Sequence, residues 1–183
     1  MQQQVDYMEC HPETVMVHTL IKVREEEKII TDPQGRGEER NVYTKFLQSN
    51  PVSTLTVLYR AEIIKKAVEL KEQILGNMHL MMGDYPLWIS FSLLGKIHTI
   101  QEITGIYRLT PNSASRPIDK KKRYLFDRNI IEIQEKFFKY CKTQHLLTKH
   151  DILEYKEKNF FGHRRLIRNH GLLAKKSILK ILG

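Results

Sequence analysis

The sequence has few cysteines, no long apolar run and no cluster of metal ligands, and each absence excludes a class of protein. Its two cysteines, Cys10 and Cys141, lie far apart and outside any CxxC pattern, so we expect neither a disulfide framework nor a zinc site. The histidines show no HxxxH or HExxH spacing. No apolar run approaches the ~20 residues that cross a bilayer, and the first ten residues, MQQQVDYMEC, lack the features of a secretory signal. We therefore expect an intracellular, cytoplasmic protein.

What the sequence does contain is enough apolar residue for a folded domain and an uneven distribution of charge. The 183 residues are 41% hydrophobic and 28% charged, which is typical of a globular protein. Residues 117–183 hold 17 Lys or Arg against 7 Asp or Glu, whereas residues 1–116 hold 13 against 14. A basic segment attached to a neutral body indicates an anionic partner, with a membrane surface and nucleic acid as the leading candidates.

The hydrophobic pattern predicts an α/β fold with a helical C-terminal tail. The predicted elements are a helix over residues 2–9, a strand over 14–23, a loop over 25–40, a helix over 42–47, a strand over 52–59, helices over 61–75 and 84–94, and a bent strand or strand pair over 96–109. From residue 117 onward the pattern is helical, with breaks near 142–148 and at Gly162 and Gly171.

The strand over 52–59 is almost continuously apolar or β-branched, which predicts burial on both of its faces. We expect it to pair beside residues 14–23 or residues 97–108. The strands are too few to close a sheet and no βαβ unit precedes them, so a sheet edge should stay open for a missing partner segment.

Three short motifs follow one another in the chain: GDYPLW at 83–88, LLGKI at 93–97 and IYR at 106–108. Together they resemble the acceptor-side, C-terminal half of family 2 glycosyltransferases. Residues 3–13, QQVDYMECHPE, resemble the helix that follows the metal-binding DxD of that family, and residues 50–60 resemble the strand and turn before its acceptor loop. The resemblance covers residues 1–116 and implies an incomplete GT-A-like sheet with flanking helices, followed by a basic helical tail over 117–183.

The resemblance implies that Asp84 is the catalytic base, because the family places an aspartate here to accept the proton of the acceptor hydroxyl. A helix N-terminus suits this role, since the helix dipole favours the ionised carboxylate. The structural alternative is that Asp84 only caps the helix, which is worth ~1 kcal/mol. Leu87 and Trp88 are expected on the buried side of the same helix.

Beyond Asp84, the resemblance implies three further residues that contact the acceptor or the diphosphate. They are Arg108, Ser113 and Ser115, and for Arg108 a surface salt bridge is the alternative. Many relatives have a histidine where this chain has Thr110, which argues against metal binding by this segment.

The donor side of the enzyme is missing from the sequence. No DxD occurs in the chain, and no alternation of strands and helices precedes the motifs. The resemblance therefore implies a fragment, a split enzyme or a mis-started reading frame, inactive by itself. A Mg²⁺ or Mn²⁺ ion, a nucleotide-sugar donor and a saccharide or lipid-linked acceptor are expected in the complete enzyme, and we expect the chain alone to bind no metal. The family implies a role in cell-envelope polysaccharide synthesis.

The tail combines apolar and cationic residues at helical spacing over 160–168 and 172–182. One interpretation is a helix on the inner surface of the membrane, and the other is a docked helix with a solvated cationic face. Nucleic-acid binding is not favoured, because only Phe160 and Phe161 flank the arginines. The rival to the enzyme is a non-catalytic binding module that this tail holds on an anionic membrane surface or on nucleic acid.

Overall fold

The computed structural model describes residues 1–25, 28–32, 42–110 and 117–171, which belong to two compact units. The first unit is Met1–Leu109 and the second is Thr110–Gly183. The first unit combines a sheet with helices and the second is helical in the described residues, so the chain is α/β. Among the described helices, none is both long and apolar enough to cross a membrane.

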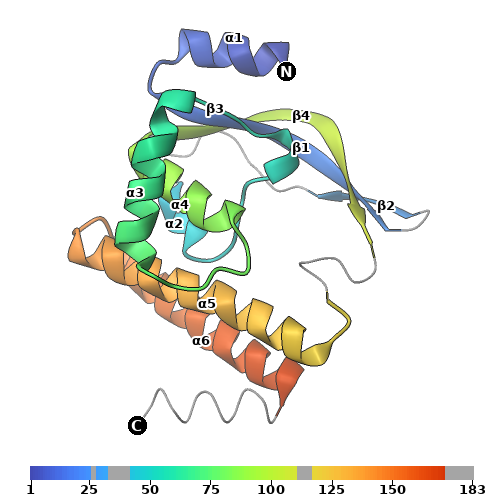
Figure 1. Ribbon diagram of the computed structural model, residues 1–183, viewed down its shortest axis with the longest axis vertical. Coiled ribbons are helices and arrows are strands. Elements are labelled where there is room, and N and C mark those ends of the chain that lie inside the picture. The colour runs from blue at the N-terminus through green and yellow to red at the C-terminus, as the bar shows by residue number, and fades with distance from the viewer. Residues whose placement is uncertain (26–27, 33–41, 111–116, 172–183) are drawn as a thin grey trace. The chain divides into compact units, whose positions relative to one another are not determined.

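A mixed four-stranded sheet forms the centre of the first unit (Figure 1). Its central strand β1 (Thr14–Glu25) pairs antiparallel with β2 (Lys28–Asp32) and with β3 (Leu58–Tyr59). On its other side β1 pairs in parallel with β4 (Lys96–Leu109) along almost the whole length of both strands, with irregular register near Thr19 and Leu20. Of the predicted strand over 52–59, only the end, Leu58–Tyr59, thus pairs beside residues 14–23, which is one of the two expected neighbours.

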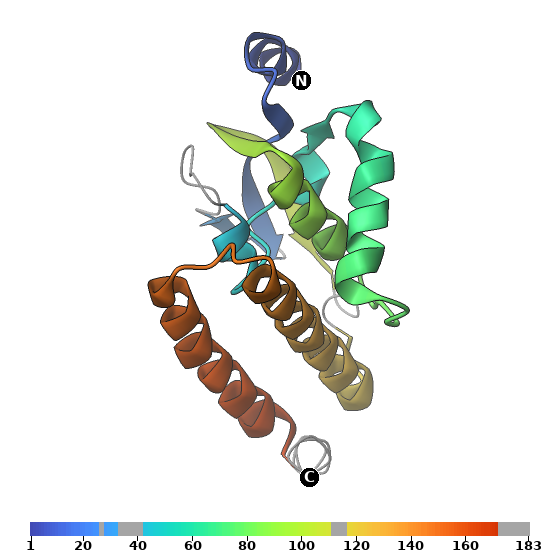
Figure 2. The same cartoon turned by 90° about the vertical axis from the view of Figure 1, so that its left-hand side faces the viewer.

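Helices cover the sheet on both faces. Helix α1 (Gln2–Cys10) lies on one side, and α3 (Ile64–Leu75) and α4 (Asp84–Leu94) lie on the other (Figures 1 and 2). Residues 14–19 of β1 are all buried, and because successive side chains point to opposite faces, both faces must be covered here. A short helix, α2 (Tyr43–Phe46), packs against α4, and a 3₁₀ turn, η2 (Ala61–Ile63), leads into α3.

One arginine ties α1 to the start of the sheet. The Nε of Arg60 donates to the carbonyl of Thr14 at 2.9 Å, and its Nη2 donates to the carbonyls of Met8 and His11 at the end of α1. A second link comes from Gln4, whose Nε2 donates to the carbonyl of Val17 at 3.2 Å. These bonds fix α1 against the first residues of β1.

The predicted strand over 52–59 is wrong except at its end. Only Leu58–Tyr59 pairs as a strand, while Thr54–Thr56 forms a 3₁₀ turn, η1. The side chains of η1 are exposed or half-buried rather than buried on both faces. The hydroxyl of Thr56 donates to the carbonyl of Ser53 at 3.0 Å, and such local bonds compete with pairing in a sheet. The predicted loop over 25–40 also contains β2 within its described residues.

The second unit is a hairpin of α5 (Lys120–Thr143) and α6 (Lys149–His170), so the predicted break near 142–148 is confirmed. The predicted break at Gly162 is wrong, because Gly162 lies inside α6. Gly171 follows the end of the helix with a φ of +52°, in the left-handed region that favours glycine.

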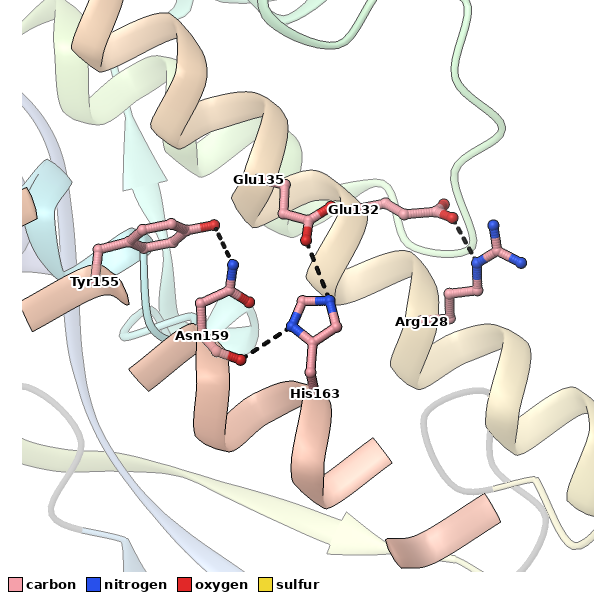
Figure 3. Close-up of polar contacts among 6 residues, drawn as sticks. All are labelled: Arg128, Glu132, Glu135, Tyr155, Asn159 and His163. Carbon is pink, nitrogen blue, oxygen red and sulfur yellow. Dashed lines mark hydrogen bonds and ion pairs between the residues drawn. The ribbon is translucent and has the colours of Figure 1, made fainter. Parts of the chain in front are cut away.

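Polar and aromatic contacts join the two helices of the hairpin, and Figure 3 shows the polar pair that crosses between them. The Nε2 of His163 on α6 lies 3.2 Å from the Oε1 of Glu135 on α5. The rings of Phe138 on α5 and Tyr155 on α6 stack with centroids 3.9 Å apart. Within α6, the amide of Asn159 donates to the Tyr155 hydroxyl. The hairpin is therefore held by specific contacts along its length as well as by its loop.

Candidate functional site

Asp84 is the first residue of α4, at the helix start where the sequence placed it. Gly83 occupies the N-cap position, so the Asp84 side chain does not serve as the N-cap of this helix. Its Oδ1 accepts the backbone N–H of Tyr85 at 2.8 Å, and its Oδ2 accepts the hydroxyl of Thr54 at 2.7 Å. The residue is half-buried. The carboxylate is thus neither enclosed in the core nor held by backbone amides alone.

A hydrogen-bond chain from the core positions this carboxylate. The indole Nε1 of Trp88 donates to the Oγ1 of Thr54 at 3.1 Å, and the same hydroxyl donates to Asp84. Trp88 is 4% exposed, as predicted, whereas Leu87 is only half-buried. Because Trp88 can only donate, the Thr54 hydrogen is directed toward the carboxylate. Thr54 comes from a different segment of the chain, and no motif in the sequence pointed to it.

An aromatic side chain stands at the edge of this arrangement. The Tyr59 ring at the end of β3 lies 6.2 Å from the Trp88 ring and 5.2 Å from the Phe91 ring. Tyr59 is 39% exposed, whereas Trp88 and Phe91 are buried. An exposed ring of this kind offers both an apolar face and a polar tip to a ligand. Asp84, Thr54 and Tyr59 therefore form the accessible part of the candidate site.

The structure does not place Arg108 beside Asp84. Arg108 lies on β4, exposed and in register with Arg24 of β1. A side chain at Gly105 would meet Leu55 of η1, so the odd positions of this strand segment face η1. Alternation then directs Arg108 to the opposite face of the sheet. Ser113 and Ser115 lie outside the described residues, and all three contacts stay predictions.

Histidines gather on the other side of the first unit. His18 on β1 is 2% exposed, and its Nε2 lies 3.0 Å from the hydroxyl of Thr99. Burial, together with a smaller effect of the charge of His98, lowers the pKa of His18 from 6.5 to about 4. The Tyr7 ring stacks between those of His11 and His98, with centroids 4.0 and 3.8 Å away. The buried, neutral His18 is a core histidine rather than a ligand.

Within the described residues, no group of three His, Cys, Asp or Glu side chains is arranged to hold a metal ion. The divalent cation remains a prediction for the complete enzyme. No family model, no curated protein and no solved structure matches this chain.

Proposed function

We propose that this chain is the acceptor-side portion of a family 2 glycosyltransferase with a GT-A-like sheet. It takes part in transferring a sugar from a nucleotide-sugar donor to a saccharide or lipid-linked acceptor in cell-envelope polysaccharide synthesis. The observation that carries the proposal is the carboxylate of Asp84, half-buried at the start of α4 and oriented by Thr54. This carboxylate lies within the GDYPLW motif that carries the family resemblance.

Asp84 has the free capacity that a base requires. Each oxygen of an ionised carboxylate offers two acceptor positions. The Tyr85 amide occupies one position on Oδ1, and the Thr54 hydroxyl occupies one on Oδ2. The remaining positions can accept the hydroxyl of an incoming saccharide, whose hydrophobic face would pack against the ring of Tyr59.

In the proposed reaction, the acceptor hydroxyl oxygen attacks the anomeric carbon of the donor sugar and forms the new glycosidic bond. The proton of that hydroxyl passes to Asp84. The bond between the anomeric carbon and the diphosphate oxygen breaks, and the diphosphate leaves with the electron pair. A divalent cation bound with the donor would stabilise the charge that develops on the leaving group.

Two observations support a donor-binding portion outside these 183 residues. The sequence contains no DxD. In addition, β4 pairs only with β1 among the described residues, which leaves its second edge without a strand partner. Ile103, Ile106 and Tyr107 of this strand are between 38% and 54% exposed. A long open edge with exposed apolar side chains is suited to pairing with a further strand.

The rival function, a non-catalytic binding module, is favoured by one observation: the excess positive charge lies entirely in residues 117–183.

A transfer assay distinguishes the glycosyltransferase from the binding module. A nucleotide-sugar-binding half of a family 2 enzyme is fused ahead of Met1, and nucleoside diphosphate release is measured with a panel of nucleotide sugars, envelope saccharides and Mg²⁺ or Mn²⁺. We expect metal-dependent transfer by the fusion and none by either half alone. No transfer beyond that of the donor half alone would favour the binding module.

A further inference from the structure

The second unit contains a cavity of its own, where α5 begins and α6 ends. Its volume is about 540 Å³, and the residues that line it include Pro117, Ile118, Lys120, Arg123, Asp127 and His170. The cavity thus brings cationic side chains from the start of one helix together with a histidine from the end of the other. The positive charge of this region is visible in the sequence, but no sequence motif locates a site within it.

Two cations of the cavity stand on the same face of α5. Lys120 and Arg123 are three residues apart, a spacing that puts their Cβ atoms ~5–6 Å from each other. The first turn of α5 contains no acidic residue, and the carboxylate of the N-cap residue Asp119 accepts the amide of Lys122. Cations at this end of a helix are disfavoured by its dipole. A bound anion would relieve both that effect and the mutual repulsion of the two side chains.

A second row of contacts orients Arg123. Its Nε lies 3.8 Å from the Oδ1 of Asp127, whose Oδ2 lies 2.8 Å from the Nε2 of His170. The His170 side chain is 6% exposed and packs edge-on against the ring of Tyr124. The buried His170 therefore holds the Asp127 carboxylate in place. Asp127 in turn attracts the Nε of Arg123, which orients the guanidinium group. The terminal nitrogens of the guanidinium can then bind two oxygens of one anion.

We infer that this cavity is a binding site for a phosphate or diphosphate group. Lys120 and Arg123 supply two positive charges against the single negative charge of Asp127, so the cavity favours an anion. Ile118, which is 73% exposed, and Pro117 add an apolar margin. A phosphate that carries an apolar chain, as in a lipid, therefore fits as well as free diphosphate. The site lies within the second unit and does not depend on the proposed transfer reaction.

The test uses the full 183-residue chain and inorganic pyrophosphate as the probe in isothermal titration calorimetry. The variant Lys120→Gln/Arg123→Gln removes both cations of the cavity. Lys139→Gln/Lys142→Gln is the matched control, with the same spacing and charge change on exposed positions of α5, ~28 Å away at 1.5 Å per residue. We expect the cavity variant to bind pyrophosphate at least ~10-fold more weakly, because two charge-assisted contacts are lost, and the control to bind like the wild type.

Three results would overturn the inference: no pyrophosphate binding by the wild-type chain, unchanged binding by the cavity variant, or an equal loss in both variants. An equal loss would indicate diffuse attraction by the basic unit.

Sedimentation with phosphatidylcholine vesicles containing phosphatidylglycerol distinguishes a lipid headgroup from free diphosphate as the source of the phosphate. If a lipid headgroup is the ligand, the cavity variant sediments less than the control and pyrophosphate competes. If free diphosphate is the ligand, both variants sediment equally while only the cavity variant loses pyrophosphate binding.

Discussion

At the scale of single residues, Thr54 connects the core to the candidate site, since its hydroxyl accepts from Trp88 and donates to Asp84. Thr54→Val keeps the shape of the side chain and removes both bonds. In the fused enzyme described above we expect turnover to fall by ~10-fold, the effect of losing about 1.4 kcal/mol of positioning, with the acceptor KM little changed. Thr54→Ser, which retains the hydroxyl, should restore most of the turnover.

The same substitution has a readout that does not depend on activity. Trp88 is the only tryptophan of the chain, so tryptophan fluorescence, excited where tyrosine does not absorb, reports on this site alone. We expect the emission of the isolated chain to change in Thr54→Val, because the indole N–H loses its partner, and to be preserved in Thr54→Ser. Identical emission and turnover in wild type, Val and Ser variants would show that the hydroxyl positions nothing.

His18 makes the stability of the first unit depend on pH. Its pKa is lowered from 6.5 to about 4 in the folded protein, so the unfolded chain binds more protons between these values. The contribution of neutral His18 to stability is therefore complete above pH 6.5 and is lost as the pH falls toward 4. Linkage sets the loss at up to ~1.4 kcal/mol per pH unit within this window. Urea unfolding at pH 7, 6 and 5 measures the slope.

The matched variant is His18→Gln, which keeps a polar side chain near Thr99 but does not titrate. We expect its unfolding free energy to be lower than that of the wild type at pH 7, because the shape of the buried ring is lost. The gap should narrow as the pH falls. Parallel pH dependence in both proteins would contradict the assignment of a buried, neutral His18.

At the scale of elements, Gly95 allows the turn between α4 and β4 to approach the start of β1. A Cβ at this position would lie 2.4 Å from the Cγ1 of Val15 and 3.0 Å from the carbonyl oxygen of Glu13. The φ of Gly95 is 175°, an extended conformation open to any residue, so space and not backbone strain requires glycine. We expect Gly95→Ala to lower the unfolding free energy by ~1–3 kcal/mol, the usual cost of overpacking.

Gly83, just before Asp84, provides the control for this prediction. A Cβ added there would meet no atom within 4 Å, and the φ of Gly83 is −97°. Gly83→Ala should therefore change stability by less than ~1 kcal/mol, which is the scale of an N-cap preference. Equal destabilisation by both substitutions in thermal or urea unfolding would refute the close approach of Gly95 and Val15.

The helices of this fold were predictable from sequence because their signals are local and periodic. The start of α4 follows from Gly83, Asp84 and Pro86, and the end of α6 from Gly171. The break predicted at Gly162 is wrong because one glycine costs a helix only ~1 kcal/mol. The contacts of Asn159 with Tyr155 and of His163 with Glu135 of α5 offset this cost, so α6 continues through Gly162.

The candidate site was predictable only in part. The position of Asp84 at a helix start follows from the sequence, but its partner Thr54 is 30 residues away. That contact depends on η1. The β-branched shape of the threonines favours a strand here, but the hydroxyl of Thr56 bonds to the Ser53 carbonyl, and this local bond takes the place of strand pairing. The position of Arg108 on the opposite face of the sheet depends on the register of β4, which a single sequence does not specify.

At the scale of the whole molecule, the two units differ in chemistry. The first carries the candidate site at Asp84, and within the described part of the chain one edge of its strand β4 has no strand partner. The second carries the positive charge and a cavity lined by Lys120 and Arg123. The proposed function requires only the first unit and a donor-binding portion, while the inferred phosphate site requires only the second, so each can be tested without the other.

The proposed role of Asp84 as the base of a glycosyl transfer can be measured by the turnover of Asp84→Asn in the fused enzyme. We expect turnover to fall by ~10²–10⁴, the contribution of a positioned base, while the Kd for the nucleotide sugar stays the same. The asymmetry follows because the base contacts the acceptor hydroxyl in the transition state and not the donor. Asp6→Asn, the same change at an exposed position of α1, should retain full turnover. Full activity of Asp84→Asn would contradict the claim.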